Sequence, residues 1–126
     1  AALVLGAKAV QVGTAFIGSN ESAAIPAYKE ALRHARDTDT VLTKSFSGRW
    51  ARGLRNKFIT EVENSGVEIP AYPVQGGLTL PIRMAAQQRN NKEFTTLWCG
   101  QSPVKNANLF VEEIFGNLIN EAEQIN

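Results

Sequence analysis

Cysteine and histidine are almost absent from this sequence. Its 126 residues contain one of each, Cys99 and His34. A single cysteine cannot close a disulfide within the chain, and two such residues do not supply the ligand set of a protein zinc site. The sequence therefore predicts neither a disulfide-stabilised fold nor a metal centre built by this chain alone.

An excess of charge and long apolar runs are also missing. Thirteen basic residues against twelve acidic residues leave a formal charge of +1, whereas dedicated nucleic-acid binders show a strong basic excess. No stretch approaches the roughly 20 apolar residues of a membrane-spanning helix. The first residues also lack the basic start and apolar core of a signal peptide. We therefore expect a cytoplasmic protein without nucleic-acid or membrane partners.

The first six residues look like the end of a helix. The segment from Ala1 to Leu5 is apolar, and Gly6 stands where a glycine commonly terminates a helix. No capping residue and no first turn precede it. We therefore expect that this chain is the later part of a longer polypeptide.

Residues 9–17 predict a buried strand. They are apolar on both alternating faces apart from Gln11 and Thr14, which is typical of strands covered on both sides in a parallel sheet. A glycine at the carboxyl end of such a strand lets a ligand approach the backbone. The amides of Gly13 and Thr14, with the Thr14 hydroxyl, suit phosphate oxygens. The alternative is a glycine that only relieves crowding in a buried strand.

Helices dominate the predicted secondary structure of the middle of the chain. Apolar spacing, proline positions and β-branched residues separate the elements. In chain order we expect a helix at 26–36, a strand at 40–46, a loop at 47–53, a helix at 54–63 ended by Ser65-Gly66, an extended segment at 69–73, and helices at 81–88 and 92–97.

The last helix has the clearest pattern. Asn108 can cap its start, and Glu112 and Glu113 lie in the first turns, where the helix dipole favours carboxylates. Apolar residues recur at the three- and four-residue spacing of one buried face. They are Val111, Ile114, Phe115, Leu118, Ile119, Ala122 and Ile125.

Several spaced blocks of the sequence form one pattern. The first block runs from Ala1 to Phe16, and shorter ones follow at 28–32, 47–56 and 98–101. In this order, and over nearly the whole chain, the blocks resemble the nitronate monooxygenases, formerly called 2-nitropropane dioxygenases, although Trp50 stands where that family commonly has proline. The resemblance implies an α/β fold, namely the C-terminal fragment of a TIM (β/α)₈ barrel with a mostly helical excursion before the final helix.

The resemblance divides the chain into three parts. Residues 1–22 correspond to the end of barrel helix seven, strand eight and the loop after it. Residues 23–105 form the mostly helical excursion, and residues 106–126 form the helix that closes the barrel.

The resemblance also implies a cofactor and an activity. In the family the stretch Gln11-Val12-Gly13-Thr14 binds the phosphate of FMN. The full-length protein would oxidise alkyl nitronates such as propionate 3-nitronate with dioxygen, giving a carbonyl compound and nitrite. The catalytic histidine is expected upstream of Ala1, so the missing N-terminal part of the barrel is a necessary partner and the fragment alone should be inactive. The oligomeric state of the full-length protein is left open. A flavin-dependent enoyl-ACP reductase of the same barrel class and a non-catalytic fragment are the alternatives.

The other conspicuous residues are interpreted mainly as structural. His34 lies one turn after Glu30 and is expected to be solvated. Cys99 has no neighbouring base or cation in the sequence to lower its thiol pKa, so we expect a buried, inert thiol. The resemblance places Gln101 near the flavin pocket. A basic run is expected to brace a loop over the barrel mouth, and consists of Lys44, Arg49, Arg52, Arg55 and Lys57.

Overall fold

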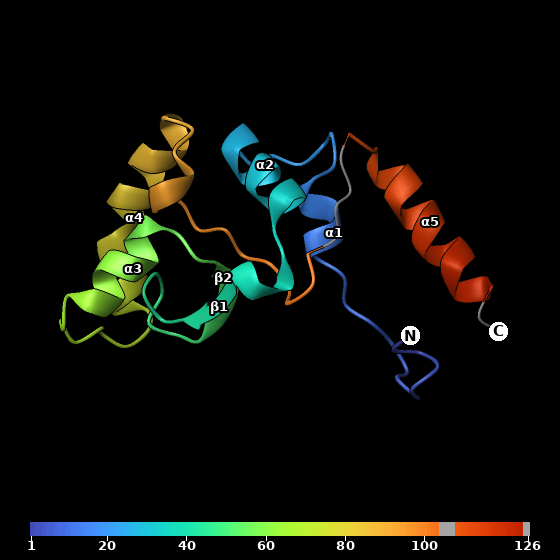
Figure 1. The fold of residues 1–126 in the computed structure, drawn as a ribbon, viewed down its shortest axis with the longest axis horizontal. Coiled ribbons are helices and arrows are strands. Elements are labelled where there is room, and N and C mark those ends of the chain that lie inside the picture. Colours follow the sequence, from blue (N-terminus) through green and yellow to red (C-terminus); the bar gives the residue numbers. More distant parts are fainter. Residues whose placement is uncertain (104–107, 125–126) are drawn as a thin grey trace.

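The computed structural model describes residues 1–103 and 108–124 of the chain (Figure 1). Helices predominate over strands in this part, which is a mixed α/β fold. The elements are α1 (Thr14–Ile17), α2 (Pro26–His34), the 3₁₀ turn η1 (Asp37–Asp39), β1 (Thr40–Thr43), β2 (Ala51–Leu54), α3 (Lys57–Asn64), α4 (Val74–Gln88), the 3₁₀ turn η2 (Lys92–Phe94) and α5 (Val111–Glu123). The α3 and α4 helices lie at one end of the molecule, and α5 and the N-terminus lie at the other (Figure 1).

A small sheet organises the middle of the chain. Strands β1 and β2 pair antiparallel, with Thr40 opposite Leu54. On the other side of β2, Gly53 forms an antiparallel bridge with Trp98. A Cβ atom at Gly53 would lie 2.8 Å from the Leu97 carbonyl oxygen, so only glycine permits this close pairing.

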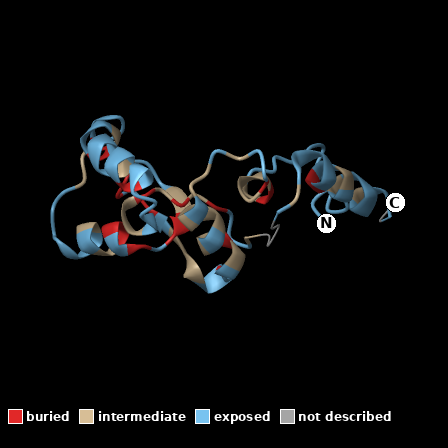
Figure 2. Cartoon of the chain, turned by 90° about the horizontal axis from the view of Figure 1, so that it is seen from above, coloured by how far each residue is buried: buried red, intermediate tan, exposed pale blue. Residues whose placement is uncertain are grey.

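Two apolar clusters join the helices to this sheet. The first consists of Leu32, Ala35, Leu54, Leu97 and Cys99 and fixes α2. In the second, the rings of Phe46 and Phe58 stack with their centroids 4.5 Å apart, and Ile59 of α3 packs with them. Figure 2 shows that buried residues gather inside this body, whereas the outer faces of the peripheral helices are exposed.

The prediction of a strand at residues 9–17 is wrong for this structure. Residues 9–13 have no regular structure, and α1 begins at Thr14. A strand needs a neighbour that satisfies its backbone groups, and no segment among the described residues pairs with residues 9–13. Val10 and Val12 are accordingly 52% and 40% exposed.

A single helical turn ends at Gly6, as expected, although residues 1–5 are not assigned as a helix. Gly6 has a φ of +96°. Its amide donates to the Leu3 carbonyl at 3.0 Å, and the Ala7 amide donates to the Ala2 carbonyl at 3.1 Å. Together these bonds form a Schellman motif, in which a left-handed glycine terminates a helical turn.

The helices in the middle of the chain exist, but several of their bounds differ from the prediction. The helix expected at 54–63 starts at Lys57, because β2 occupies part of the expected loop and continues through Leu54. Pro81, expected to begin a helix, lies inside α4. The helix expected at 92–97 is only the turn η2, since its following residues pair with β2 instead.

The start of the last helix is capped differently from the prediction. Phe110, not Asn108, is the residue before the first turn, and its amide donates to the Glu113 carboxylate at 2.7 Å. The Val111 amide donates to the Glu21 carboxylate at 3.1 Å. Asn108 has a φ of +59° and accepts a hydrogen bond from Arg33 at 2.8 Å, which removes it from the capping position.

The apolar face of α5 is only partly covered. Ile114 is 1% exposed and packs inward as predicted. Val111, Phe115 and Ile119 are 40%, 58% and 44% exposed, so the prediction of one buried face is wrong for these positions. Ile125 lies outside the described residues. Among the helices that the structure describes, none has the length and apolar character needed to cross a membrane.

Candidate functional site

Residues 11–13 form an open loop, and Thr14 is the first residue of α1; residues 11–14 are here called the candidate loop. Gln11, Val12 and Gly13 are exposed, and Thr14 is partly buried. A Cβ atom at Gly13 would meet no other atom within 4 Å. Within residues 1–103 and 108–124, no backbone carbonyl accepts a hydrogen bond from the amides of these four residues. The loop therefore presents unused N–H donors around a glycine that a ligand can approach.

One long-range hydrogen bond connects this loop to the block at residues 98–101. The Gly100 amide donates to Thr14 Oγ1 at 2.8 Å. Because the hydroxyl oxygen accepts this bond, its own proton is left to donate to another oxygen. Gln101, next to Gly100, is exposed. A phosphate monoester, with several acceptor oxygens and negative charge, matches this set of donors.

Cys99 is buried on the inner side of the same block. It is 7% exposed and belongs to the apolar cluster that fixes α2. Burial raises the pKa of its thiol, and the nearby Arg52 guanidinium offsets only part of this effect. The expectation that no cation lies near Cys99 is therefore wrong. The raised thiol pKa still disfavours the nucleophilic thiolate.

His34 is a solvated helix residue, as predicted. Its side chain is 77% exposed, and its Nε2 atom lies 2.7 Å from the Glu30 carboxylate. This hydrogen bond is the main reason why the pKa of Glu30 lies below its usual value. The pair lies on the exposed side of α2.

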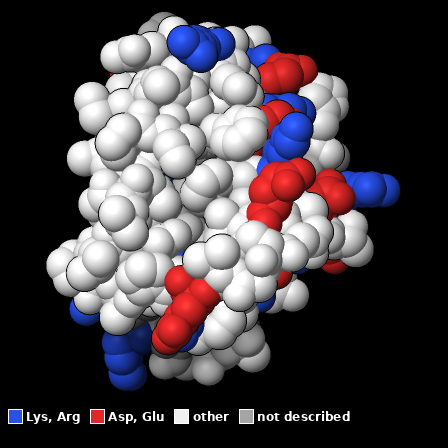
Figure 3. Space-filling model, turned by 90° about the vertical axis from the view of Figure 1, so that its left-hand side faces the viewer, with Lys and Arg blue, Asp and Glu red and all other residues white. Residues whose placement is uncertain are grey.

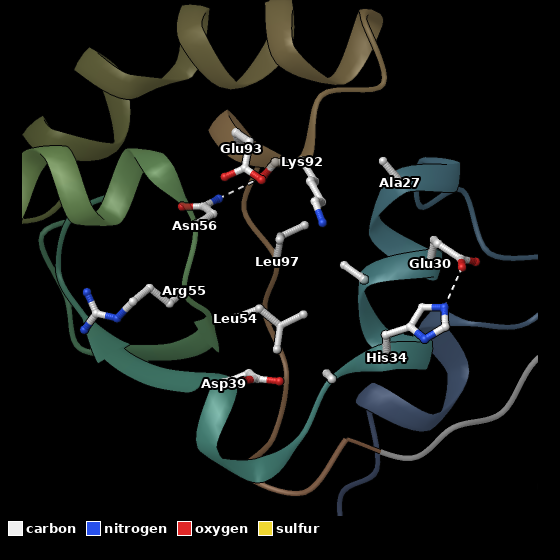
Figure 4. A pocket seen from close by; sticks show the side chains of 12 residues that line it. Ala27, Glu30, His34, Asp39, Leu54, Arg55, Asn56, Lys92, Glu93 and Leu97 are labelled. Atoms are coloured by element: carbon white, nitrogen blue, oxygen red, sulfur yellow. Dashed lines mark hydrogen bonds and ion pairs between the residues drawn. The ribbon is translucent and has the colours of Figure 1, made fainter.

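A pocket of about 410 Å³ lies between α2 and the body, beside the apolar cluster that joins them (Figure 4). Its floor is apolar and includes Leu54 and Leu97. Two acidic groups at its edge already have partners, since Asp39 pairs with the Arg36 side chain and Glu93 accepts from the Lys57 amide. The full lining is Ala27, Glu30, Ala31, His34, Ala35, Asp39, Leu54, Arg55, Asn56, Lys92, Glu93 and Leu97. Nowhere in the described part do three or more His, Cys, Asp or Glu side chains gather as a metal site would require.

The basic run braces the chain internally, as expected. Four of its five residues have partners within the chain. That the braced loop lies over the barrel mouth stays a prediction. Lys44 lies over the Trp50 ring (4.9 Å from the centroid), Arg49 over the Tyr72 ring (4.1 Å), Arg52 donates to Thr40 (3.0 Å), and Arg55 pairs with Glu63 (2.9 Å).

Sequence reasoning missed the role of Asn56. Its side chain caps α3 by accepting from the Ile59 amide at 3.2 Å. It also donates to the Lys92 and Thr95 carbonyls at 2.9 and 2.8 Å. An asparagine directly before a helix is a capping signal, but it is recognisable only if the helix is predicted to begin at Lys57.

Comparisons with known proteins cover nearly the whole chain. Residues 1–121 match the sequence model of the nitronate monooxygenases. A probable nitronate monooxygenase of Staphylococcus aureus (strain JH9) is 45% identical over 125 residues, which are 99% of this chain and 35% of that protein.

Two solved structures share the fold. The nitroalkane oxidase from Streptomyces ansochromogenes has a TM-score of 0.85 and 35% identity, over 97% of this chain and 35% of its own. FabK from Thermotoga maritima has a TM-score of 0.76 and 31% identity, over 98% and 40%.

The match includes the candidate loop at residues 11–14, its partner block at 98–101 and most of α5. The chain spans about a third of the length of the curated relatives it matches. Because the family's sequence model extends over residues 1–121, the chain belongs to the nitronate monooxygenase family.

Proposed function

We propose that this chain is the C-terminal part of an FMN-dependent nitronate monooxygenase built on a TIM (β/α)₈ barrel. The complete protein would oxidise alkyl nitronates, with propionate 3-nitronate as the natural substrate, and would use dioxygen to give a carbonyl compound and nitrite. The observation that carries this proposal is the family match over residues 1–121. The open loop at residues 11–14 adds a site of suitable chemistry.

In this proposal the chain's own residues hold the cofactor by its phosphate. The free amides of residues 11–14 donate to phosphate oxygens, and Gly13 allows the phosphate to approach the backbone. The Thr14 hydroxyl, oriented by the Gly100 amide, donates its own proton to a phosphate oxygen. FMN supplies the electron-transfer chemistry when bound, and the protein binds and orients it.

A second groove supports the proposal that the rest of the barrel packs against this chain. It has a volume of about 460 Å³ and lies between the N-terminal turn and α5. Exposed apolar surface of this kind marks a contact site. The groove is lined by Ala1, Ala2, Leu3, Val10, Val12, Phe16, Phe115, Leu118, Ile119, Glu121 and Ala122. The flavin-ring contacts and the catalytic base would come from the part of the protein that fills it.

The likeness to FabK supports a second candidate function, that of a flavin-dependent enoyl-ACP reductase. Its lower TM-score and identity, compared with the nitroalkane oxidase, favour the monooxygenase. Turnover of a nitronate with dioxygen, set against turnover of an enoyl thioester with NAD(P)H, separates the two activities in the full-length protein.

The phosphate assignment is tested by Gly13→Leu in the full-length protein. A side chain at this position meets nothing within the described residues, and the φ of −119° is open to any residue. We therefore expect an intact fold with flavin content reduced at least tenfold, measured by absorbance after desalting. Ala23→Leu adds similar volume at an exposed position outside the loop and should keep its flavin. Normal flavin content in Gly13→Leu would contradict the assignment.

A further inference from the structure

The block at residues 28–32 resembles the family but has no part in the site described above. It lies on α2, where Tyr28 and Leu32 are one turn apart and share one face. Leu32 is buried in the apolar cluster that contains Cys99, and the Tyr28 ring packs against this cluster. A tyrosine placed in this way needs a partner for its hydroxyl. Burial, and to a smaller extent the nearby Cys99, raises the pKa of Tyr28, so the hydroxyl keeps its proton and remains a donor.

The partner of Tyr28 lies in the block at residues 98–101. The Tyr28 hydroxyl donates to the Trp98 carbonyl. Two hydrogen bonds, of 2.9 and 3.1 Å, pair the segment at residues 97–99 with β2. Because alternate residues of an extended segment present their backbone groups to opposite edges, the backbone groups of Trp98 face away from β2. Tyr28 therefore holds the edge of this segment that β2 leaves open.

The same open edge carries the bond to the candidate loop. The next residue that faces this edge is Gly100, and its amide donates to Thr14 Oγ1 at 2.8 Å. Without the Tyr28 hydroxyl, the Trp98 carbonyl would turn to another donor, and the Gly100 amide would move with it. The direction in which Thr14 points its own proton therefore depends on Tyr28.

Lys29 fixes α2 on the other side of the candidate loop. Its Nζ atom donates to the Ser19 carbonyl at 2.7 Å, just after the end of α1, and Ser19 is 1% exposed. This charge-assisted bond holds α2 beside the short helix that begins at Thr14. Two adjacent residues of the block thus reach the two supports of the candidate loop, α1 and the segment at residues 97–100.

We propose that Tyr28 is a positioning residue of the FMN phosphate site. Its hydroxyl holds the Trp98 carbonyl, and thereby the Gly100 amide that directs the Thr14 hydroxyl at the phosphate. This inference rests on the proposed function. Tyr28 does not itself bind the phosphate, since its one proton is donated to a carbonyl. Misdirection of one hydrogen bond to a charged group weakens binding about tenfold.

Removal of the Tyr28 hydroxyl tests this role in the full-length protein. Tyr28→Phe keeps the ring in the apolar cluster and removes only the donor. FMN and riboflavin, which has the same ring system without the phosphate, are titrated against the apoprotein and followed by flavin fluorescence. We expect the dissociation constant of FMN to rise about tenfold and that of riboflavin to change by less than about twofold. An unchanged affinity for FMN, or an equal loss of affinity for both flavins, would overturn the proposal.

A double-mutant cycle tests whether Tyr28 acts through Thr14. Thr14→Val keeps the branched shape of the side chain but lacks the hydroxyl, so it should raise the dissociation constant of FMN about tenfold by itself. In the Thr14→Val background Tyr28→Phe should add less than about twofold, because the group that it positions is already absent. If the two effects multiply in the double variant, Tyr28 acts by another route and the proposal is overturned.

Tyr72→Phe is the matched control for Tyr28→Phe. Tyr72 is 52% exposed and lies just before α4, at the end of the molecule away from α1 (Figure 1). The surface at that end shows a broad area without charged side chains (Figure 3), so it offers little to a phosphate. The control should keep the wild-type affinity for both flavins. A loss of FMN affinity as large as that in Tyr28→Phe would overturn the proposal.

The wild-type protein separates a failure of this inference from a failure of the proposed function. Wild-type protein that binds FMN without turning over nitronates would count against the proposed activity alone, because the flavin titrations require no turnover. Wild-type protein without affinity for FMN would overturn both proposals.

Discussion

Replacement of Asn56 by alanine should strongly destabilise the body of the fold. The side chain is 6% exposed and makes three hydrogen bonds, one to the start of α3 and two to the segment around η2. Loss of a helix cap costs about 1 kcal/mol. Leaving the buried Thr95 carbonyl without its donor costs about 1–3 kcal/mol. The Lys92 carbonyl keeps a second, longer bond at 3.4 Å from the Thr95 amide, so its loss adds less.

The expected total is on the order of 3 kcal/mol, a large part of the 5–15 kcal/mol by which ordinary domains are stable. Urea unfolding of the full-length protein, followed by tryptophan fluorescence and far-UV circular dichroism, measures the change as a lowered midpoint at constant m. Asn56→Asp separates the contributions, since a carboxylate keeps the cap but cannot donate to the two carbonyls. We expect the Asp variant to remain clearly destabilised.

Asn91→Ala is the matched control for Asn56→Ala. Asn91 caps η2 by accepting from the Glu93 amide at 2.9 Å, but it is exposed and its side chain makes only this bond within the described residues. Its loss should cost about 1 kcal/mol or less. If Asn56→Ala lowers the unfolding midpoint no more than Asn91→Ala does, the role assigned to Asn56 is refuted.

Cys99→Ser should leave turnover of the full-length enzyme within a few-fold and lower its stability by about 1–3 kcal/mol, because a hydroxyl replaces a thiol in an apolar cluster; loss of turnover with flavin intact would argue for a chemical role. Gly48→Ala should lower the melting temperature by several degrees, because Gly48 has a φ of +82° and a Cβ there would lie 2.5 Å from the Pro70 carbonyl oxygen; an unchanged melting curve would contradict this packing. The 126-residue chain alone should not bind FMN tightly, since the flavin-ring contacts are expected elsewhere; stoichiometric binding by a folded monomer in a flavin fluorescence titration would refute the fragment interpretation.

Local signals in the sequence predicted the elements that local interactions determine. The helix α2 follows from Pro26 and its apolar stripe, although it ends two residues earlier than expected. The helix ends at Gly6 and Ser65-Gly66 follow from glycines that adopt a positive φ, +96° and +69°. In each case the deciding contacts lie within one or two turns of the residue, so the pattern carries the necessary information.

Elements that depend on distant partners could not be predicted in this way. Strand β2 pairs with β1 on one side and with residues 97–99 on the other, and nothing in its own sequence indicates either partner. Residues 9–13 have the composition of a buried strand but no pairing partner among the described residues, so the pattern predicts a structure that this chain alone does not form. In the candidate site, the bond between Thr14 and Gly100 joins residues 86 positions apart. The segments that contain Thr14 and Gly100 both belong to blocks that resemble the family, whereas their contact is visible only in the fold.

The hydrogen bonds that join the two ends of the long segment after residue 13 also affect how the fold tolerates change. The Asn20 amide meets the Leu109 carbonyl at 3.0 Å, and Glu21 holds the first turn of α5. These contacts hold the start of α5 beside residues 20–21. The two parts of the chain are therefore as close as if a short turn joined them, whatever the length of the chain between the contacts. The entropy of closing a loop grows only slowly with its length, and segments with adjacent ends are those that tolerate insertion and replacement. Exposed turns between Glu21 and Leu109 should therefore accept a change in length while the two flanking elements keep their places.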